Sequence, residues 1–513
     1  MDQSISSPAS ILPRSAARYG DKCALIVDGR SFSFAELDEL SDRVAGALAT
    51  RGVRQGQLVS LYSQNRWEWI VAYHGILKAG AMVNPVNVML TYDELAFVLD
   101  DCEAVAVFTS GDHAPRVVTA AESLPRLRHV ISFDAVDAVD AGGVESFDNL
   151  LASTADAPVM TIDEAGPCSV GYTSGTTGHP KGAVQSHRAV FLNCALTATM
   201  HGRNDEDIVV TALPTPHVYG NVVVNGTFIT GGTVVLMERF AASRALELIE
   251  VHRATMFEGV PTMYAMMLAD EGSRNRDLSS LTRSTVGGQT MPTATIERWQ
   301  TLTGAPMLEL WGMTEIAGLG ATHTVHAPTI PGSIGVSLPG IELRVVDLTD
   351  PTLEAALGEP GELMVRGPIV MLEYFGNPEA TAEVLEPDGW LHTGDIARKD
   401  ETGHYFVVDR RKDMIITGGY NIYPAEIERV MAAHPAIALV AVGSVPDEVK
   451  GELACAYVVR TPNSHVTADE LIAFAGERLA AYKRPRLVRF VDSLPTTSSG
   501  KIMRRRLHES VDA

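Results

Sequence analysis

The sequence predicts a large α/β domain followed by a small α+β domain. Three observations predict this fold class. The chain has 513 residues, which at roughly 100–200 residues per domain is enough for several domains or subdomains. Up to about residue 400, short β-branched and apolar runs alternate with helical stretches, a pattern typical of buried sheets covered by helices. After that point the pattern changes, and the remaining segment of about 100 residues has the size of a separate minor domain.

The elements of the large domain follow in chain order. Ser33 and Glu36 form a predicted capping box, which should stabilise the start of a helix by about 1 kcal/mol. Apolar residues continue this helix along one face: Leu37, Leu40, Val44 and Leu48. Further along, apolar runs predict strands at 104–108, 130–133, 208–213 and 233–237, with a helix at 241–252.

The small domain begins near a dense cluster of charges at residues 409–413, which follows a predicted hairpin turn at 399–403. The pattern then predicts a helix at 424–433, strands at 438–443 and 453–459, a helix at 468–481 and a strand at 487–491. We therefore place the domains at 1–409 and 410–513. Because hinges occupy a few residues between elements, the charge cluster is also the predicted hinge.

Composition and charge exclude several classes of function. The sequence holds 41 Lys and Arg against 63 Asp and Glu, a net charge of −22. Its 46% hydrophobic and 20% charged residues are those of an ordinary globular protein. The acidic excess argues against non-specific binding to nucleic acids and to anionic membrane surfaces, because both need clustered cations. A polyanion such as a nucleotide must then be bound by local groups.

The sequence also predicts a cytoplasmic protein without a membrane span. The N-terminus lacks the basic and apolar regions of a signal peptide, and no apolar run approaches the roughly 18–20 residues that cross a bilayer. The five cysteines are scattered without a CxxC pair, so neither a disulfide framework nor a zinc site is expected.

A loop rich in glycine and hydroxyl groups at residues 172–182 predicts a phosphate-binding site. It contains three glycines, four Ser or Thr hydroxyls and one lysine, Lys181. Glycines let backbone N–H groups approach an anion, and the hydroxyls and the lysine add donors and charge. The loop is not the P-loop of NTPases, since Pro180 or Ala183 stands where that motif needs its second glycine.

Four further motifs follow the loop: 311–315 (WGMTE), 393–395 (TGD), 409–413 (DRRKD) with 418–421 (GGYN), and 499–501 (SGK). Together with the loop they resemble the signature motifs of the adenylate-forming superfamily, which includes acyl-CoA ligases, peptide-synthetase adenylation domains and beetle luciferases. The resemblance covers essentially the whole chain. It implies a large N-terminal domain of the adenylate-forming fold with a small mobile C-terminal cap. The implied reaction activates a carboxylic acid as an acyl-adenylate.

The resemblance implies a nucleotide site and a metal. The loop would cover the β- and γ-phosphates of ATP, and Glu315 would bind Mg²⁺. Trp311 would lie next to the adenine, and Asp395 would accept hydrogen bonds from the ribose hydroxyls. The implied ATP- and AMP-binding residues are Thr173, Ser174, Gly175, Thr176, Thr177, Gly178, Lys181, Gly288, Gln289, Trp311, Gly312, Met313, Thr314, Asp395, Arg410 and Lys501.

The resemblance also implies catalytic residues, a hinge and CoA contacts. Lys501 would bridge the attacking carboxylate and the α-phosphate. Lys412 matches the hinge residue on which the cap swings between two poses, and Gly418, Gly419 and Tyr420 would form the passage for pantetheine. The implied catalytic residues are Lys501, Glu315, Thr173 and His217.

Segment 214–221 matches the border of the superfamily's acyl pocket and places His217 beside the reacting carboxylate. The implied pocket residues are His217, Val218, Asn221, Gly287, Gly312 and Met313. Apolar neighbours favour a fatty acid of medium or long chain, or another hydrophobic acid. Arg239, Glu258 and Gln289 leave a polar or dicarboxylic acid open, and a ligase of aromatic acids is a further alternative.

CoA is the expected acceptor, because the chain carries no carrier-protein domain. A ligase that loads a carrier protein stays open, as does a non-catalytic nucleotide-binding protein, against which intact Lys501, Glu315 and Asp395 argue. The expected partners are a carboxylic acid, ATP, Mg²⁺ and CoA, without nucleic acid, and a homodimer is one of the open oligomeric states.

Overall fold

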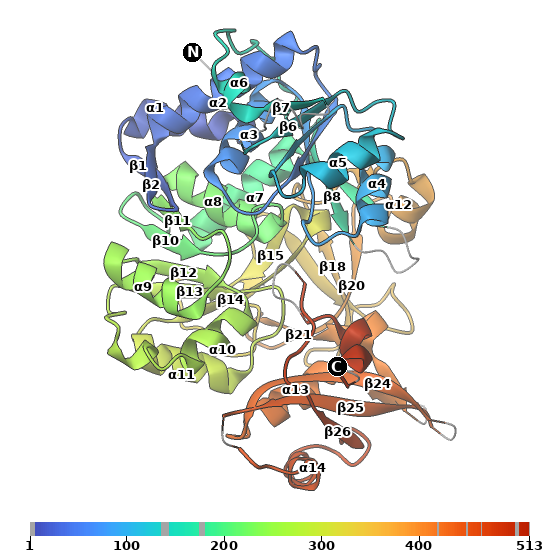
Figure 1. The fold of residues 1–513 in the computed structure, drawn as a ribbon. Coiled ribbons are helices and arrows are strands. Elements are labelled where there is room, and N and C mark those ends of the chain that lie inside the picture. Colours follow the sequence, from blue (N-terminus) through green and yellow to red (C-terminus); the bar gives the residue numbers. More distant parts are fainter. Residues whose placement is uncertain are drawn as a thin grey trace.

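The computed structural model describes residues 6–134, 143–173, 180–417, 420–447, 450–462, 464–497 and 502–511. Within these ranges a large body of helices and sheets lies above a small domain formed by the last part of the chain (Figure 1). The mixed α/β class predicted from the sequence is confirmed.

Two long sheets build the large body. The first has the strand order β19-β9-β8-β4-β3-β5-β6-β7 and the second β16-β15-β14-β13-β12-β10-β11-β1-β2. The strands of the first sheet are β3 (Leu58–Tyr62), β4 (Met82–Pro85), β5 (Ala106–Thr109), β6 (His129–Ser132), β7 (Val144–Ser146), β8 (Pro167–Thr173), β9 (Lys181–Ser186) and β19 (Glu373–Tyr374). Those of the second are β1 (Cys23–Val27), β2 (Arg30–Ser33), β10 (Ile208–Thr211), β11 (Thr233–Leu236), β12 (Met256–Gly259), β13 (Arg283–Val286), β14 (Met307–Met313), β15 (Gly318–Thr322) and β16 (Val336–Ser337).

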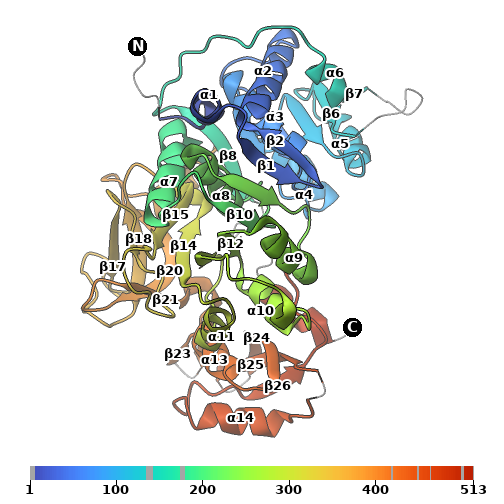
Figure 2. The same cartoon turned by 90° about the vertical axis from the view of Figure 1, so that its left-hand side faces the viewer.

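Helices cover the two sheets and join their parallel strands. The helices of the large body are α1 (Ile11–Tyr19), α2 (Phe34–Thr50), α3 (Trp67–Lys78), α4 (Tyr92–Asp101), α5 (Ala114–Ala121), α6 (Phe147–Leu151), α7 (His187–Met200), α8 (Val218–Thr230), α9 (Ala242–His252), α10 (Pro261–Ala269), α11 (Thr293–Thr303) and α12 (Pro378–Val384). α2 starts with the predicted capping box, in which Ser33 and Glu36 bond each other's backbone N–H groups. Helices α7 and α8 lie at the centre of the body (Figure 2), and both contribute to each of its two main hydrophobic cores.

A third, antiparallel sheet carries the chain toward the small domain. It consists of β17 (Glu342–Val346), β18 (Gly361–Arg366), β20 (Leu391–Lys399) and β21 (Tyr405–Arg410). The hairpin turn predicted at 399–403 joins β20 to β21, which confirms that expectation. This sheet places the motif at 393–395 opposite the end of β21, because Asp395 pairs with Arg410 in the strand register.

The small domain has its own sheet and core. Its strands are β22 (Ile415–Thr417), β23 (Tyr420–Ile422), β24 (Ile437–Asp447), β25 (Gly451–Arg460) and β26 (Leu487–Phe490), and its helices are α13 (Pro424–Ala432) and α14 (Ala468–Gly476). The prediction that the second helix runs to residue 481 is wrong, because α14 ends at Gly476. Glycine is a poor helix residue, and beyond it the Arg484 side chain bonds the carbonyl of Leu479 instead.

The chain leaves the third sheet within the charge cluster at 409–413 and then enters the sheet of the small domain. β21 ends at Arg410 in the third sheet, and β22 begins at Ile415 in the sheet of the small domain. One hydrogen bond crosses this point, from the backbone N–H of Ala425 to Asp409 Oδ2, at 2.8 Å. The division into 1–409 and 410–513 stays a prediction, which this change of sheet supports.

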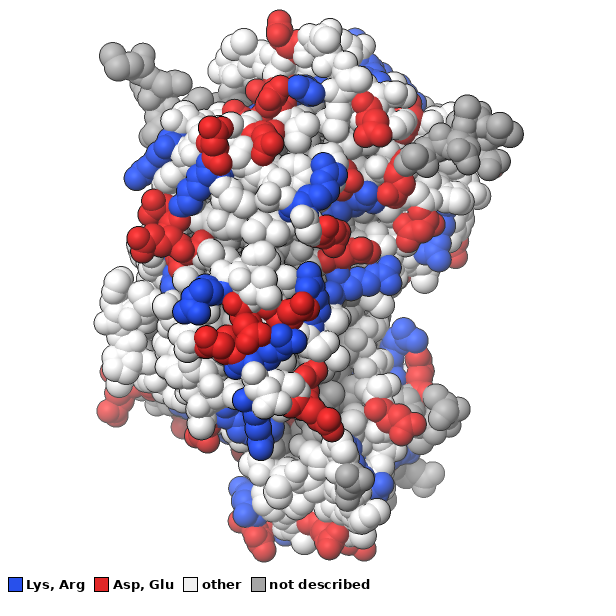
Figure 3. Space-filling model, turned by 60° about the vertical axis from the view of Figure 1, so that its left-hand side comes forward, with Lys and Arg blue, Asp and Glu red and all other residues white. Residues whose placement is uncertain are grey.

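On the face shown in Figure 3, Lys and Arg side chains are interspersed with Asp and Glu, so neither sign of charge forms one large patch there. In the part of the chain that the structure describes, no helix is both long and apolar enough to cross a bilayer.

Candidate active site

The phosphate loop connects two paired strands. β8 and β9 form an antiparallel hairpin in which Thr173 lies opposite Lys181, so the two ends of the loop are held side by side. Lys181 Nζ is 3.8 Å from Glu383 Oε2 and 5.3 Å from the centre of the Tyr374 ring. The predicted loop residues Ser174, Gly175, Thr176, Thr177 and Gly178 lie outside the described residues.

Glu315 faces this hairpin from the short 3-10 turn Thr314–Ile316 that follows β14. Its Oε1 accepts hydrogen bonds from the Tyr374 hydroxyl at 3.0 Å and from Thr173 Oγ1 at 3.4 Å. Burial and the adjacent carboxylate raise the pKa of Tyr374, so the phenol stays protonated and donates. No described residue donates to Oε2 of Glu315, and the side chain borders a cleft. This oxygen is therefore available to a cation in the cleft.

Two buried amides fix the turn that carries Glu315. Gln185 Nε2 on β9 donates to the Thr314 carbonyl at 2.7 Å. Asn193 on α7 donates to the carbonyls of Ile316 and Leu319, at 3.0 and 2.8 Å, and accepts from the Leu319 N–H at 2.9 Å. Gly318 has φ +148°, and a Cβ there would lie 2.4 Å from Asn193 Oδ1. The hydrogen bonds of Asn193 to this segment therefore require glycine at 318.

Trp311, Asp395 and Arg410 meet on the other side of the motif. Trp311 Nε1 donates to Asp395 Oδ2 at 2.7 Å, and Arg410 Nε lies 3.3 Å from Asp395 Oδ1. Asp395 is buried, whereas Arg410 is half-exposed. Both carboxylate oxygens thus already have a partner, yet each oxygen can accept a second hydrogen bond.

A cleft of about 620 Å³ borders Glu315 and its partner Tyr374, and Thr393 and Gly394 next to Asp395. It lies between the end of β14 and the third sheet, and it brings motif residues that are distant in sequence to one wall. Its lining includes Met313, Glu315, Glu362, Tyr374, Glu383, His392, Thr393, Gly394 and Arg411. Among the described residues there is no cluster of three or more His, Cys, Asp or Glu that could hold a metal by itself. A cation bound to Glu315 would need oxygen ligands from a substrate, which is the usual way Mg²⁺ is held with phosphates.

Of the predicted acyl-pocket residues, His217, Val218 and Asn221 lie at the start of α8, Gly287 follows β13, and Gly312 and Met313 lie at the end of β14. His217 caps α8, where its Nδ1 accepts from the backbone N–H of Tyr219 at 3.2 Å, which places the proton of a neutral ring on Nε2. Val218 is the first residue of the helix. Asn221 Oδ1 accepts from Asn225 Nδ2 at 3.1 Å and faces the Tyr73 hydroxyl at 3.5 Å.

Glycine at 287 is required by close packing across the pocket. A Cβ on Gly287 would lie 2.1 Å from Leu310 Cδ1 and 3.4 Å from Tyr219 Cε1. Gly288 and Gln289 follow it at intermediate exposure, and Gly312 lies on β14 directly after Trp311. Of the residues that left a polar acid open, Glu258 is buried, whereas Arg239 is largely exposed beside Glu238 and away from Glu258.

The residues predicted for the hinge, CoA and the lysine belong to the small domain or its border. Lys412 lies in the 3-10 turn Arg411–Asp413, and Arg411 Nη1 is 3.4 Å from Glu362 Oε2. Tyr420 is exposed and stacks on Tyr482, with ring centres 4.9 Å apart. Gly418, Gly419 and Lys501 lie outside the described residues.

Sequence reasoning did not identify Tyr374, Gln185 and Asn193, although each one touches or fixes the turn of Glu315. Tyr374 reaches the site because β19 pairs with β9 at Ala183. No motif marks these residues, since a single Tyr, Gln or Asn has no informative spacing. Only the strand order and the helix packing bring them to Glu315.

Comparison with known proteins defines the class. The family model of the AMP-binding enzymes matches residues 12–375, and that of the AMP-binding enzyme C-terminal domain matches 426–501. A methyl-dioxo-octahydroindenyl-propanoyl:CoA ligase of Mycobacterium tuberculosis is 36% identical over 510 residues, covering 97% of each chain. A long-chain-fatty-acid–CoA ligase of Bacillus subtilis is 32% identical over 527 residues, covering 98% of this chain and 94% of its own. The crystal structure of the anthranilate CoA ligase AuaEII with anthranoyl-AMP superposes with a TM-score of 0.91 at 28% identity, covering 98% and 97%.

The chain therefore belongs to the AMP-binding enzyme family, the adenylate-forming enzymes that its motifs resemble. Within that family it is an acyl-CoA ligase that uses ATP, and the prediction of an acid–thiol ligase is confirmed at this level. The fold of a large N-terminal and a small C-terminal domain is likewise that of its structural neighbours.

Proposed function

We propose that the protein ligates a hydrophobic carboxylic acid to CoA in two half-reactions at the cleft beside Glu315. In the first, a carboxylate oxygen attacks the α-phosphorus of ATP, the bond from that phosphorus to the bridging oxygen breaks, and pyrophosphate leaves. In the second, the CoA thiolate attacks the acyl carbon and AMP leaves. Catalysis of such transfers consists mainly of positioning and charge stabilisation.

The observation that carries this proposal is the closeness of Thr173 to Glu315, at 3.4 Å, with Lys181 opposite Thr173 in the pairing of β8 and β9. The hydroxyl and ammonium groups at the base of the phosphate loop are donors for the β- and γ-phosphates. Glu315 lines the cleft and its Oε2 has no donor among the described residues, so this carboxylate suits a hard cation shared with those phosphates. When bound, Mg²⁺ would neutralise the charge that develops on pyrophosphate.

The remaining assignments rest on the position of each residue in its motif. Asp395 and Arg410 would hold the ribose, and Lys501 would contact the α-phosphate and the attacking carboxylate. His217 would donate from Nε2 toward that carboxylate, since Nδ1 is used to cap α8. Gly418, Gly419 and Tyr420 would guide pantetheine after a swing at Lys412.

The acid is hydrophobic in the main, because the residues that surround α8 and β13 are apolar. The acids named for the relatives are a ring-bearing propanoate, long-chain fatty acids and anthranilate, so both chains and rings occur in the family. CoA is favoured over a carrier protein as the acceptor, because the relatives are named as CoA ligases. The cytoplasmic location and a homodimer stay predictions.

The test is a panel of aliphatic and aromatic acids incubated with ATP, Mg²⁺ and CoA, with thioesters detected by mass. Omitting CoA should leave acyl-adenylate and pyrophosphate, and the nucleotide product should be AMP. Formation of ADP, or of no pyrophosphate with any acid, would overturn the proposal.

A further inference from the structure

The motif at 393–395 is a bulge in strand β20. On either side of the bulge, β18 and β20 are in register, with Glu362 opposite Ile396 and Met364 opposite His392. Between these two pairs β18 contributes one residue, whereas β20 contributes three, which are the whole motif. A bulge interrupts the ladder of backbone hydrogen bonds and re-aims the side chains that it carries. The N–H groups of the motif therefore need acceptors from outside the ladder.

Side chains supply these acceptors. Glu362 Oε1 accepts from the Gly394 N–H at 3.2 Å. Thr393 Oγ1 accepts from the Asp395 N–H at 3.1 Å and donates to the Leu363 carbonyl at 2.6 Å. Gly394 has φ +70°, a left-handed conformation that glycine adopts without strain. Glu362 thus takes the place of the missing ladder partner in the turn that carries Asp395.

Glu362 is a buried carboxylate with donor groups near both oxygens. Its side chain is 8% exposed, and its Oε2 lies 3.3 Å from His392 Nδ1 and 3.4 Å from Arg411 Nη1. His392 is held on its other side as well, with Nε2 3.1 Å from Glu386 Oε1. A buried carboxylate is tolerated when it is paired and hydrogen-bonded, so these groups fix Glu362 in the position from which it holds the bulge.

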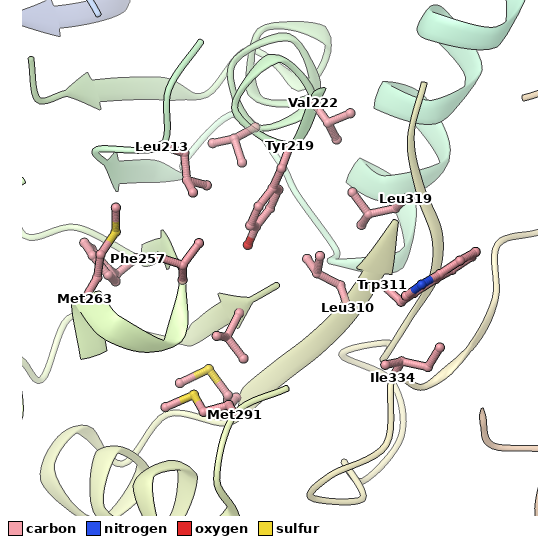
Figure 4. Packing of buried hydrophobic residues seen from close by; sticks show 14 of the residues in the cluster. Leu213, Tyr219, Val222, Phe257, Met263, Met291, Leu310, Trp311, Leu319 and Ile334 are labelled. Atoms are coloured by element: carbon pink, nitrogen blue, oxygen red, sulfur yellow. The ribbon is translucent and has the colours of Figure 1, made fainter. Parts of the chain in front are cut away.

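The opposite side of the predicted ribose site is fixed by packing instead. Figure 4 shows Trp311 among the apolar side chains of the large hydrophobic cluster, which includes Leu319 and Ile334. Gly320 lies directly against the ring, since a Cβ there would be 2.4 Å from Trp311 Cζ3. The indole N–H that reaches Asp395 Oδ2 at 2.7 Å is therefore held in place. The bulge is the part of the site whose position depends on hydrogen bonds from side chains.

We propose that Glu362 is a positioning residue, which orients Asp395 through the Gly394 N–H and thereby gives the enzyme its preference for ribonucleotides over deoxyribonucleotides. Without an acceptor at 362, the Gly394 N–H turns toward water and Asp395 shifts relative to Trp311. Its oxygens then no longer face both ribose hydroxyls. Support of this kind is what holds a binding group to the geometry that it needs. This inference rests on the proposed function, because it concerns the ribose contact of Asp395.

The test compares ATP with 2′-deoxy-ATP and 3′-deoxy-ATP in pyrophosphate release, with Mg²⁺ and the acid that the enzyme uses best. Each analogue lacks one of the hydroxyls that would donate to Asp395. Because a hydrogen bond to a charged group is among the strong ones, the wild-type kcat/KM for ATP should exceed that for each analogue by at least ~10-fold.

Two variants separate the hydrogen bond of Glu362 from its charge. Glu362→Ala removes the acceptor and should bring both ratios to within ~3-fold of 1, through a higher KM for ATP, because the analogues have less to lose. Glu362→Gln keeps an oxygen for the Gly394 N–H and should retain most of the wild-type preference. A purely structural role would instead lower Tm and slow all three nucleotides by the same factor.

The matched control is Glu386→Ala, which removes the other carboxylate beside His392 and should keep the wild-type ratios. If Glu362→Ala does not fold, Glu362→Asp decides, because its shorter side chain keeps the charge and withdraws the acceptor from Gly394. Wild-type ratios in the variant that decides overturn this inference alone. Ratios near 1 in the wild type overturn the inference together with the ribose role of Asp395, whereas no adenylation of any acid overturns the proposed function.

Discussion

Glu315 and Asp395 are both buried carboxylates, yet their hydrogen-bond partners differ. Asp395 has a partner on each oxygen, the Trp311 N–H and Arg410. Glu315 lines the cleft and accepts from Tyr374 and Thr173 on Oε1, whereas its Oε2 has no donor among the described residues. This difference supports the proposal that Glu315, and not Asp395, binds a cation.

Replacing Glu315 by Gln should remove the charge that a cation needs while keeping the acceptor for Tyr374. We expect the rate of pyrophosphate release to fall by at least ~10²-fold, the usual scale for one transition-state stabilising group. Tyr374→Phe is the matched comparison, because it removes only the hydrogen bond to Oε1. It should cost less than Glu315→Gln, and its apparent Mg²⁺ affinity, taken from rate against Mg²⁺ concentration, should stay closer to wild type.

Glu309 lies on β14, just before the motif at 311–315, and we expect its ionisation to make the stability of the protein depend on pH. Burial raises the pKa of Glu309 from 4.5 to about 8, although the Gly332 N–H donates to its Oε2. The folded state therefore holds a proton that the unfolded state loses near pH 4.5. The stability that this group contributes is present below that pH and is lost as pH rises toward 8, with a slope of up to about 1.4 kcal/mol per pH unit.

Glu309→Gln keeps an acceptor for Gly332 and cannot ionise. It should flatten the fall of thermal stability between pH 5 and 8 and raise Tm relative to wild type at pH 9, measured by calorimetry or circular dichroism. Equal slopes for the two proteins would contradict the assigned pKa.

At the scale of elements, the position of Glu315 depends on how α7 packs against the turn after β14. Asn193 makes one hydrogen bond to the backbone of that turn, at Ile316, and two to Leu319 of β15, and Gln185 makes another to Thr314 from β9. A turn has few internal hydrogen bonds, so these side chains pair with backbone groups that a helix or a strand would otherwise pair with each other. The proposed chemistry belongs to the motif residues, and side chains of α7 and β9 hold the turn that carries Glu315.

Asn193→Ala should loosen this turn. Leaving buried backbone groups unpaired costs about 1–3 kcal/mol each, so a fall in unfolding free energy of a few kcal/mol is expected. The kcat of adenylation should fall by a larger factor than the KM of the acid rises, because Glu315 shifts and the acyl pocket does not. Thr199→Ala on the exposed side of the same helix is the control and should leave both quantities near wild type.

At the scale of the whole molecule, the chain passes from the third sheet to the small domain through residues 411–414, between β21 and β22. The contacts that border this passage are polar: Asp409 to the Ala425 N–H, Arg411 to Glu362 and Arg504 to Glu428. Polar contacts of this kind can be exchanged for water at low cost, unlike a buried apolar interface. The hinge at Lys412 stays a prediction, which the polar character of these contacts supports.

Lys412→Pro should restrict rotation of the cap at this hinge, because proline fixes φ near −65°. If one pose serves each half-reaction, pyrophosphate release without CoA should stay within ~3-fold of wild type, whereas thioester formation falls by at least ~10²-fold. Lys412→Ala, which leaves the backbone free, is the control for the side chain. A similar loss in both half-reactions would argue against a hinge at this residue.

The sequence by itself determined the features that depend on local chemistry. The capping box of Ser33 and Glu36, the hairpin at 399–403, the phosphate loop and the four motifs that follow it each consist of neighbouring residues. Their physics is local: a side chain reaches the backbone three residues away, and a glycine admits an anion. The helix predicted at 468–481 is too long, because the apolar pattern continues past Gly476, where α14 ends.

Only the tertiary structure decided which of these groups meet. Tyr374 joins Glu315 through the pairing of β19 with β9, and Asn193 reaches the turn because α7 packs beside it. Glu362 and Gly394 come together from separate strands, which no periodicity predicts. The physical reason is that partners across a sheet or between packed helices are set by strand order and register. Those are properties of the whole chain, and no short stretch of sequence contains them.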